Sequence, residues 1–314
     1  MIKQNASFPL LFLILSVICL ALGSVLAKNI LNEASPSPFL FLVVQLIGST
    51  IFLWTVIAVQ GIRFDYAKYI SLLYKVGLVV GVGSIFTILA LNFTSASLAS
   101  IVFAIQPVLI VVFAWGLLQE RPQGYHLLFG ALAVVGVVIT IAAPDANQSA
   151  TNAAGAVFAL ISTSLAALYV VMMRRITMTL NPLVALACIQ TMGLGIAILT
   201  WVIGGQLLPL SNDPITMLQG VGIAATGAIY YGLAFWLYLL GLQTITASVA
   251  GLYLNLVPVF TILFAFFLIG ERLTARGWLG VLTVLVAIFC VSLFTLREDA
   301  SRPSKELPAD ASCS

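Results

Sequence analysis

Residues 95–121, SASLASIVFAIQPVLIVVFAWGLLQER, recur later in the chain as residues 246–272, TASVAGLYLNLVPVFTILFAFFLIGER. When the two stretches are aligned without a gap at an offset of 151, ten of the 27 positions are identical. Shared apolar composition alone seldom aligns a proline with a proline and a Glu-Arg pair with a Glu-Arg pair. A repeat of this kind in a hydrophobic chain is typical of transport proteins built from two related halves.

The composition of the whole chain indicates a membrane protein. Of the 314 residues, 62% are hydrophobic and 7% are charged, and the mean hydropathy is +1.17, whereas a soluble domain carries about 25% charged residues. The apolar runs are about 20 residues long, the length of a helix that crosses ~30 Å of hydrocarbon. They are apolar on all sides, whereas barrel strands would alternate. We therefore predict an all-α membrane protein.

Ten transmembrane helices are predicted, five in each half. They cover residues 8–27, 39–60, 75–92, 97–118, 125–143, 153–173, 182–204, 218–239, 247–269 and 276–296. The first repeat is then 1–148 and the second is 149–296, and the polar tail 297–314 is expected to be disordered in the cytoplasm. An alternative for the first span is a signal peptide ending in Val25-Leu26-Ala27. Its cleavage would break the repeat, so we expect the span to be retained.

The basic residues of the loops predict the orientation of the chain. Ten of the thirteen Lys and Arg residues fall on the side that holds both termini. Because basic loops stay in the cytoplasm, we expect both termini there. Five is an odd number, so the second half enters the membrane in the opposite sense, as a 5+5 inverted-topology repeat. The net charge of +3 follows from the loop bias and indicates no nucleic-acid partner.

Further features repeat in the two halves. The second and seventh spans begin at Ser37-Pro38 and Asn181-Pro182, each a capping residue followed by a first-turn proline. Inside these spans Gln45 and Gln190 each precede a glycine by three residues. The two glutamines are therefore candidates for symmetry-related positions.

The recurring prolines and Glu-Arg pairs are candidates for hinges and gates. Pro107 and Pro258 fall in the middle of the fourth and ninth spans, where a missing donor bends a helix and opens a cavity. A harmless bend is the alternative. Glu120-Arg121 is predicted on the cytoplasmic side and Glu271-Arg272 on the outer side. Each pair is either an ordinary boundary ion pair or a salt bridge that forms and breaks as gates move.

No Asp or Glu falls in the middle of a predicted span. Ionisable groups inside a bilayer usually mark function, and antiporters that exchange cationic drugs for protons need such a carboxylate. The single histidine, His126, has no partner at the midplane, and the four cysteines have no metal or disulfide spacing. Since nucleotide-binding fingerprints are also missing, we expect no cofactor, no metal site and no enzyme chemistry.

Neutral side chains must then recognise the cargo. The candidates for substrate binding are Gln45, Ser97, Ser100, Tyr169, Gln190, Tyr231, Trp236, Ser248, Tyr253 and Asn255. Tyr230 is a further aromatic candidate, and Tyr231, Phe235 and Tyr238 share one helical face. Packing or interhelical hydrogen bonding is the alternative for each residue. Lys28, at the end of the first span, is expected to extend to the interface. Such a cavity suits neutral or zwitterionic solutes, whereas phosphates need Lys or Arg.

The doubled pattern of Ala-Ser-x-Ala, mid-helix Pro-Val and terminal Glu-Arg resembles the EamA-type branch of the drug/metabolite transporter superfamily. The resemblance covers residues 8–296. It implies a central cavity formed mainly by spans 3, 4, 8 and 9 and flanked by spans 1, 2, 6 and 7. It also implies export or exchange of small metabolites, often amino acids, across the bacterial inner membrane. Many relatives have Trp-Gly where this chain has Leu22-Gly23, and Arg where it has Gln45, which leaves the substrate open.

The sequence therefore favours a secondary transporter that moves a small neutral or zwitterionic, amino-acid-like metabolite by alternating access. Its partners would be that solute and the lipid bilayer, without nucleic acid, and a homodimer is compatible but not required. One alternative is an exporter of aromatic or drug-like compounds coupled to protons. Another is a membrane scaffold or receptor without flux, which would normally need larger extramembrane domains.

Overall fold

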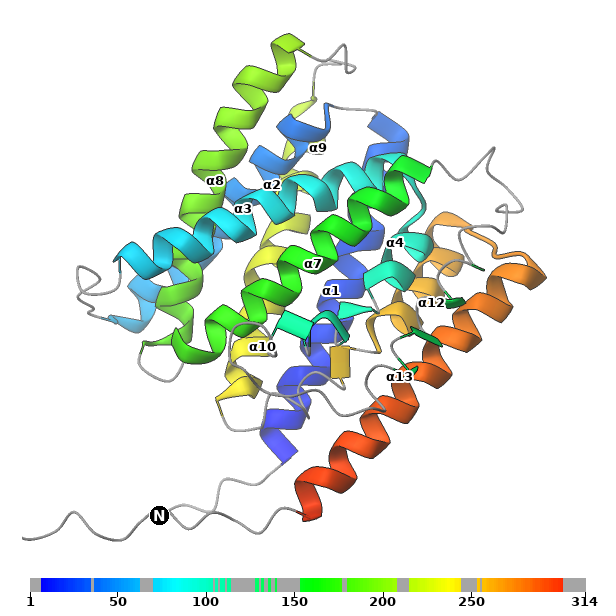
Figure 1. Cartoon of the computed structure of the whole chain (residues 1–314). Helices are drawn as coiled ribbons and strands as arrows, with labels where there is room; N and C mark the ends of the chain where they lie inside the picture. The colour runs from blue at the N-terminus through cyan, green and yellow to red at the C-terminus, as the bar shows by residue number, and fades with distance from the viewer. Residues whose placement is uncertain are drawn as a thin grey trace, which may run out of the picture.

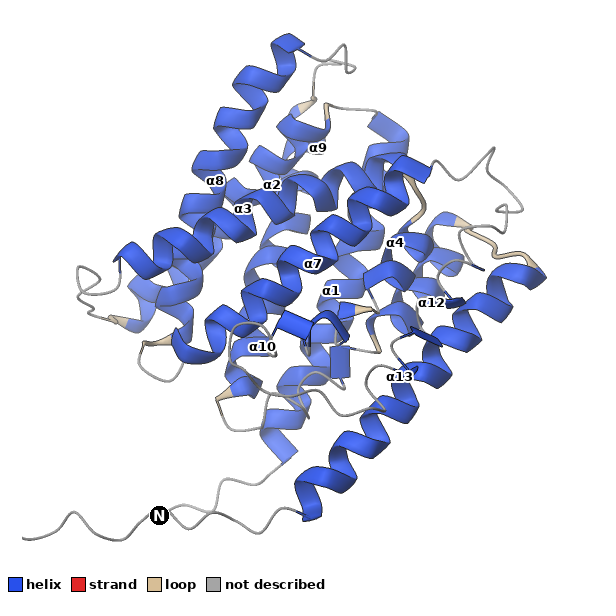
Figure 2. Cartoon of the chain, in the orientation of Figure 1, coloured by secondary structure: helices blue, strands red, loops and turns tan. Residues whose placement is uncertain are grey.

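The computed structural model describes most of the predicted helical segments. The described residues are 7–34, 37–62, 70–103, 105–106, 108–110, 112–113, 128–129, 131–132, 135–136, 139, 153–176, 180–207, 215–243, 253–254 and 256–301. Every regular element within these ranges is a helix, which confirms the all-α class (Figure 2).

The helices follow one another along the chain with short connections between several of them. They are α1 (Ser7–Ala34), α2 (Pro38–Gln60), α3 (Ile70–Phe93), α4 (Ala96–Phe103), α7 (Ala153–Ile176), α8 (Pro182–Leu207), α9 (Met217–Gly227), η1 (Ala228–Ala234), α10 (Phe235–Leu242), α12 (Val257–Ile269) and α13 (Ala275–Ser301). η1 is a π-helix that continues α9 into α10, so these three elements form one rod. α13 extends beyond residue 296, the predicted end of the last span, to Ser301.

Six helical stretches of the described chain are long and apolar enough to cross a membrane. They are α1, α2, α3, α7, α8 and the α9–α10 rod, which coincide with predicted spans 1, 2, 3, 6, 7 and 8. Shorter apolar helices, α4, α12 and the first part of α13, fall in spans 4, 9 and 10. Most of predicted span 5 lies outside the described residues. The protein is a multi-pass helical membrane protein, and the count of ten spans stays a prediction.

Local sequence determines where α2 and α8 begin and end. α2 begins at Pro38 and α8 at Pro182, as predicted, because proline has no N–H to lose in the first turn. Oδ1 of Asn181 accepts a hydrogen bond from the Leu183 N–H at 2.9 Å and so caps α8. α2 ends at Gly61, whose φ of 62° is a left-handed conformation that glycine adopts without strain.

The helices pack in pairs that repeat between the two halves. α1 contacts α9, η1 and α10, and α3 lies alongside α7 in the corresponding way (Figure 1). α1 also contacts α12, as α7 contacts α4, while α2–α8 and α4–α12 pair directly across the halves. Exchanging α1 with α7, α2 with α8, α3 with the α9–α10 rod and α4 with α12 leaves this pattern unchanged. Two equivalent units therefore build the molecule, in agreement with a two-repeat architecture.

α2 and α9 cross in backbone contact because both helices carry a glycine there. A Cβ atom added at Gly227 would collide with the backbone of Gln45, and one added at Gly48 would collide with the backbone of α9. At the equivalent crossing of α3 with α8, a Cβ atom at Gly81 would lie 3.2 Å from the Gly193 Cα. Small residues at both crossings let the helices approach closely, as membrane helices require for packing without a hydrophobic driving force.

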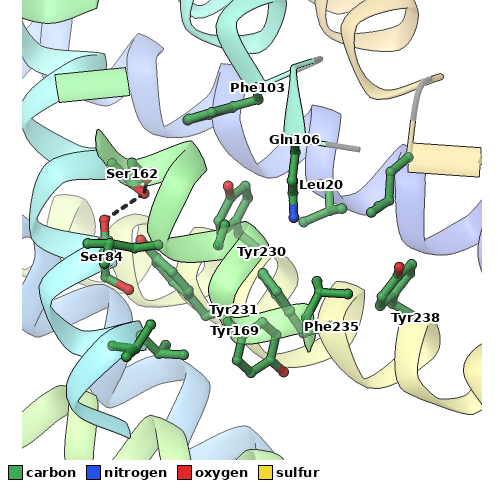
Figure 3. A pocket seen from close by; sticks show the side chains of 18 of the residues that line it. Leu20, Ser84, Phe103, Gln106, Ser162, Tyr169, Tyr230, Tyr231, Phe235 and Tyr238 are labelled. Carbon is green, nitrogen blue, oxygen red and sulfur yellow. Dashed lines mark hydrogen bonds between the residues drawn. The ribbon is translucent and has the colours of Figure 1, made fainter. Parts of the chain in front are cut away.

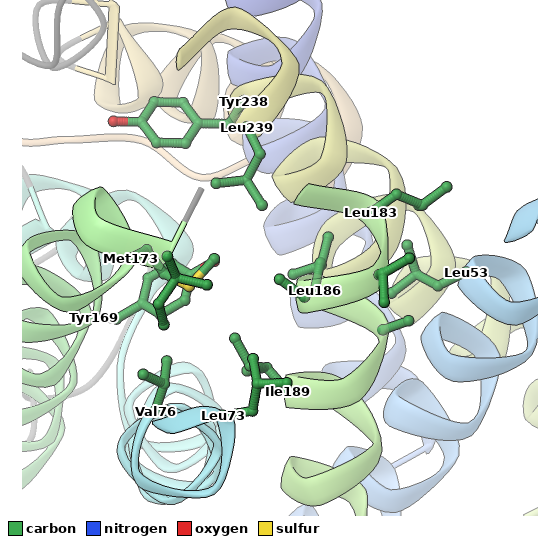
Figure 4. Close-up of a cluster of buried hydrophobic side chains, with 14 of the residues drawn as sticks. Leu53, Leu73, Val76, Tyr169, Met173, Leu183, Leu186, Ile189, Tyr238 and Leu239 are labelled. Atoms are coloured by element: carbon green, nitrogen blue, oxygen red, sulfur yellow. The ribbon is translucent and has the colours of Figure 1, made fainter. Parts of the chain in front are cut away.

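A cluster of buried apolar side chains joins α2, α3, α7, α8 and α10 (Figure 4). Leu53, Leu73, Met173, Leu186 and Leu239 represent these five helices, and each is at most 2% exposed. The cluster fixes α7, α8 and α10 relative to one another. These three helices also carry much of the cavity wall described next.

Candidate substrate cavity

A cavity of about 130 Å³ lies where helices of both halves meet (Figure 3). Its walls come from α1, α3, α4 and Gln106 in the first half and from α7, α8, η1, α10 and α12 in the second. Since one water needs about 10–15 Å³ of such space, the cavity has room for a solute of on the order of ten non-hydrogen atoms.

Aromatic rings from the second half form one wall of the cavity. Tyr169 of α7 meets Phe235 of α10 edge-on, with ring centroids 6.0 Å apart, and Tyr230 meets Tyr231 at 4.8 Å. Tyr230 also lies 6.2 Å from Phe235, and Tyr238 completes the wall. Edge-to-face contacts of this kind stabilise aromatic clusters beyond the area they bury. The wall therefore offers a rigid apolar surface to a solute.

The π-helix η1 ties this wall to neighbouring helices through its carbonyls. The Ser16 hydroxyl of α1 donates to the Ala234 carbonyl at 2.8 Å, and Nε2 of Gln190 in α8 donates to the Tyr231 carbonyl at 3.2 Å. π-helical turns inside α-helices are rare and frequently mark functional sites. Here the π-helical stretch carries Tyr230 and Tyr231 on the cavity wall.

Hydroxyl groups gather on the α3 and α7 side of the cavity. The Thr87 and Ser162 hydroxyls lie 2.6 Å apart and share a hydrogen bond, and the Ser84 side chain lines the same side of the cavity. Figure 3 shows Ser84 and Ser162 together on one side of the ring cluster. The cavity therefore has a polar side and an apolar side, which suits a solute with one polar end.

Two polar atoms at the cavity have no hydrogen-bond partner among the described residues. They are the hydroxyl of Tyr169 and Oε1 of Gln190, and both are buried. Leaving a buried polar atom unpaired costs about 1–3 kcal/mol. Such atoms are natural contacts for a bound solute.

None of the described lining residues is an Asp, Glu, Lys, Arg or His. Across the described part of the chain, no three His, Cys, Asp or Glu side chains are grouped to hold a metal ion. The lining can bind by dispersion, ring stacking and neutral hydrogen bonds. It offers no charged partner for an ion and no nucleophile–base pair for catalysis.

Lys28 and Glu271 bind the backbone on the two sides of the break between α3 and α4. Lys28 is only 5% exposed, and its Nζ donates to the Leu91 carbonyl in the last turn of α3 at 2.8 Å. Lys28 therefore turns into the protein instead of extending to the interface, and a carbonyl at the C-terminal end of α3 is a favourable partner for its ammonium group. Arg272, beside Glu271, lies over the Phe266 ring at 5.9 Å.

Glu271 connects the end of α12 to the start of α4. Its carboxylate accepts hydrogen bonds from the Ala96 N–H at 3.1 Å, the Ser97 N–H at 3.2 Å and the Ser97 hydroxyl at 2.7 Å. Oγ of Ser95 accepts from the Leu98 N–H at 3.1 Å. The first N–H groups of α4 are thus satisfied, and the acceptor for two of them comes from the other half.

A central cavity between two equivalent sets of membrane helices is the architecture of a two-repeat transporter. The sequence model of the EamA-like transporter family matches residues 7–142 and again residues 153–293, one match for each half. The chain belongs to the EamA-like transporter family. Membership makes this protein a membrane transporter and agrees with the sequence resemblance.

Curated proteins similar to this EamA family member are also described as transporters. An uncharacterized transporter of Archaeoglobus fulgidus is 26% identical over 240 residues, which cover 76% of this chain and 83% of that protein. An uncharacterized transporter of Clostridium kluyveri is 22% identical over 289 residues, covering 88% and 90%. A protein of known crystal structure superimposes with a TM-score of 0.63 at 16% identity, covering 89% of this chain and 98% of that one. This last likeness concerns the fold alone.

Three predicted substrate-binding residues line the EamA cavity together: Tyr169, Gln190 and Tyr231. The other described candidates have different neighbours. Nε2 of Gln45 donates to the Thr226 hydroxyl at 3.0 Å where α2 crosses α9. The Trp236 ring lies 6.4 Å from the Phe52 ring, Tyr253 packs against the apolar cluster, and Ser97 binds Glu271.

Of the remaining predicted site residues, most lie wholly or partly outside the described residues. Ser248, Asn255, Pro107, Glu120 and Arg121 lie outside the described residues, and Ser100 belongs to α4 with its side chain outside the described part. Pro258 stands in the first turn of α12 and lines the cavity, directly after a break in the helix.

Sequence reasoning did not select the hydroxyl side of the cavity. Ser84, Thr87 and Ser162 line that side, and the Gln106 amide, which was also not selected, lines another part of the cavity. The available signal was weak: Ser84 and Thr87 stand three residues apart on an otherwise apolar helix, which places them on one face. Single hydroxyls are common in membrane helices, where they hydrogen-bond neighbouring backbone, so such a signal alone does not identify a site.

Proposed function

We propose that this EamA transporter moves a small neutral or zwitterionic, amino-acid-like metabolite by alternating access. The observation that carries the proposal is the cavity between the two halves, whose described lining contains hydroxyls, amides and rings but no charged side chain. A zwitterion has no net charge, and neutral dipoles can bind both of its ends. Phosphorylated solutes would call for Lys or Arg in the lining.

We infer that the helices form a 5+5 inverted repeat with both termini in the cytoplasm, in a bacterial inner membrane. The packing pattern that survives exchange of the two halves supports the repeat. The excess of Lys and Arg on the side of the termini supports the orientation. The proposed direction of transport is export or exchange of the solute.

Contact between Glu271 and the start of α4 is proposed to close one end of the cavity. The contact joins α12 of the second half to α4 of the first, and both helices contribute to the lining through Pro258 and Phe103. Rocking of the halves about the break before Pro258 would separate these groups. Because the halves are similar, the two end states are expected to be close in energy, so modest binding energy can shift the balance.

Aromatic or drug-like compounds are the second candidate cargo. The ring wall formed by Tyr169, Tyr230, Tyr231, Phe235 and Tyr238 favours them, since stacked rings bind planar apolar groups. A mechanism that couples their export to protons would need a titrating group, and the described lining offers only tyrosine hydroxyls for that role.

Transport by the purified protein in liposomes tests the function. Vesicles preloaded with one unlabelled solute should take up the same labelled solute by exchange, across a panel of neutral L-amino acids and aromatic compounds. We expect uptake of at least one neutral amino acid without nucleotide and without a pH gradient, and none in protein-free vesicles. Strict dependence on a proton gradient would favour the second candidate. No uptake of any solute, together with no solute-induced shift in thermal unfolding, would contradict the proposal.

A further inference from the structure

We propose that Gln190 and Tyr169 select solutes carrying an N–H or O–H donor, and that Gln190 is the specificity-determining residue of the cavity. The inference rests on the proposed transport function and adds which chemical group of the solute is recognised. It follows from the hydrogen bonds that the cavity residues already make and from the two polar atoms left over.

The Gln190 amide has a fixed orientation. The side chain is 1% exposed, and its Nε2 donates to the Tyr231 carbonyl of η1 at 3.2 Å. Rotating the amide by half a turn would place two oxygens against each other and lose this bond. Oε1 is therefore held as an acceptor, and it has no donor among the described residues. An acceptor of this kind can be satisfied only by an N–H or O–H group.

Two other hydroxyls of the cavity bind each other, because Thr87 pairs with Ser162. Tyr169 differs, because its hydroxyl is buried without a described partner while its ring is held edge-on against Phe235. A hydroxyl can both donate and accept. The two buried polar atoms of the cavity without a described partner thus belong to α7 and α8, which follow one another along the chain.

The aromatic rings could also bind a quaternary ammonium group, which is the alternative to a solute with an N–H or O–H donor. Clusters of tyrosines bind quaternary ammonium groups through cation–π attraction, without any N–H donor. Such a ligand would leave Oε1 of Gln190 without a hydrogen bond. It would also bring its own ammonium group out of water without giving that group a hydrogen-bond acceptor. The fixed acceptor therefore favours a primary ammonium or an amide over its fully methylated counterpart of the same charge.

The test compares L-leucine and L-phenylalanine with their N,N,N-trimethyl betaines, which keep the charges but lack N–H groups. In liposomes, the wild-type protein should exchange the amino acids at least tenfold faster than the betaines at equal, subsaturating concentration. Gln190→Met, which keeps the side-chain length, should lower amino-acid exchange about tenfold and leave betaine exchange unchanged, as loss of a hydrogen bond to a charged group predicts.

Two further variants separate recognition from folding. Tyr169→Phe removes a hydroxyl without a described partner, so it should keep or raise the temperature of thermal unfolding while lowering amino-acid exchange about threefold. Thr191→Val is the matched control on α8. The Thr191 hydroxyl accepts from Trp54 at 3.0 Å and is not part of the described lining, so the preference for amino acids should not change.

The outcomes distinguish this inference from the proposed function. Betaines exchanged as fast as the amino acids, or an unchanged amino-acid-to-betaine ratio in both Gln190→Met and Tyr169→Phe, would overturn the inference while leaving amino-acid transport intact. No exchange of any amino acid or betaine by a folded wild-type protein would overturn both.

Discussion

Lys28 is a buried and Glu271 a partly buried charged side chain, and backbone dipoles make their positions favourable. The carboxylate lies at the N-terminus of α4 and the ammonium group at the C-terminus of α3, so each charge faces the opposite end of a helix dipole. Ser97 adds a third hydrogen bond to the carboxylate. The two charges are thus used within the α3–α4 junction.

Replacing Glu271 by glutamine should weaken this junction. The amide keeps the shape of the carboxylate but has one acceptor oxygen and no charge for the Ala96 and Ser97 N–H groups. We expect a loss of about 1–3 kcal/mol in stability, measured as a lower midpoint of thermal unfolding in detergent. Glu33→Gln is the control, because the hydrogen bond of Glu33 among the described residues, with Asn29, is exposed and such contacts contribute little. Equal midpoints for the two variants would contradict the role of Glu271.

At single residues the sequence could predict type but not surroundings. Gln45 and Gln190 stand in equivalent places of the repeat, and nothing local distinguishes them. The Gln45 amide donates a hydrogen bond to the Thr226 hydroxyl where α2 crosses α9, whereas Gln190 lines the cavity. Which neighbour a buried amide meets depends on how the helices pack, and two near-identical local patterns cannot contain that information.

Among the elements, helix starts were predictable because their determinants are local. Proline at the first position marks the beginning of α2 and α8; the Asn181 side chain caps α8, whereas the Ser37 side chain makes no capping hydrogen bond at α2. The π-helix η1 was not predicted, since its residues Ala228–Ala234 have no composition that separates π from α geometry. Its formation depends on partners from other helices, such as Ser16 and Gln190, that accept the altered backbone.

The α2–α9 crossing should be intolerant of any added carbon. Gly227→Ala would push a Cβ atom into the Gln45 backbone, which has no flexible side chain to move away. We expect a loss of about 1–3 kcal/mol, the usual cost of overpacking. Gly195→Ala is the matched control, since an added Cβ meets nothing within 4 Å there. That variant should be neutral or slightly more stable, because alanine favours helix. The midpoints of thermal unfolding of the two variants in detergent test this prediction. An unchanged midpoint in Gly227→Ala would contradict the backbone contact between α2 and α9.

For the whole molecule, orientation is a prediction that fusion proteins can check. A fluorescent reporter fused after residue 314 should mature, and a phosphatase that is active only outside the cytoplasm should be silent there. The physical reason is the excess of Lys and Arg on the side of the termini. The same phosphatase inserted after Gly270 should be active, because the inverted second half places that connection outside. An active phosphatase at the C-terminal end would reverse the assignment.

The packing of the helices follows the two-fold repeat, whereas the residues that line the cavity do not. Helix packing survives exchange of the halves, yet the rings lining the cavity come chiefly from the second half and Ser84 and Thr87 from the first. The repeat was visible in the sequence because identical residues recur at a fixed offset. The lining was only partly predictable, because at several of its positions the halves have diverged, as at Phe103 and Leu254.

Because of the π-helix η1, the positions of the side chains in the ring wall depend on the number of residues in each turn of the α9–α10 rod. Each i to i+5 turn holds one residue more than an α-helical turn, so η1 acts as an inserted residue within a continuous helix. If η1 closed as an ordinary α-helix with all of its residues, every side chain after it would rotate by about 100° relative to α9. Phe235 and Tyr238 would leave the ring wall without any change in their identity, so binding depends on phase as well as on composition.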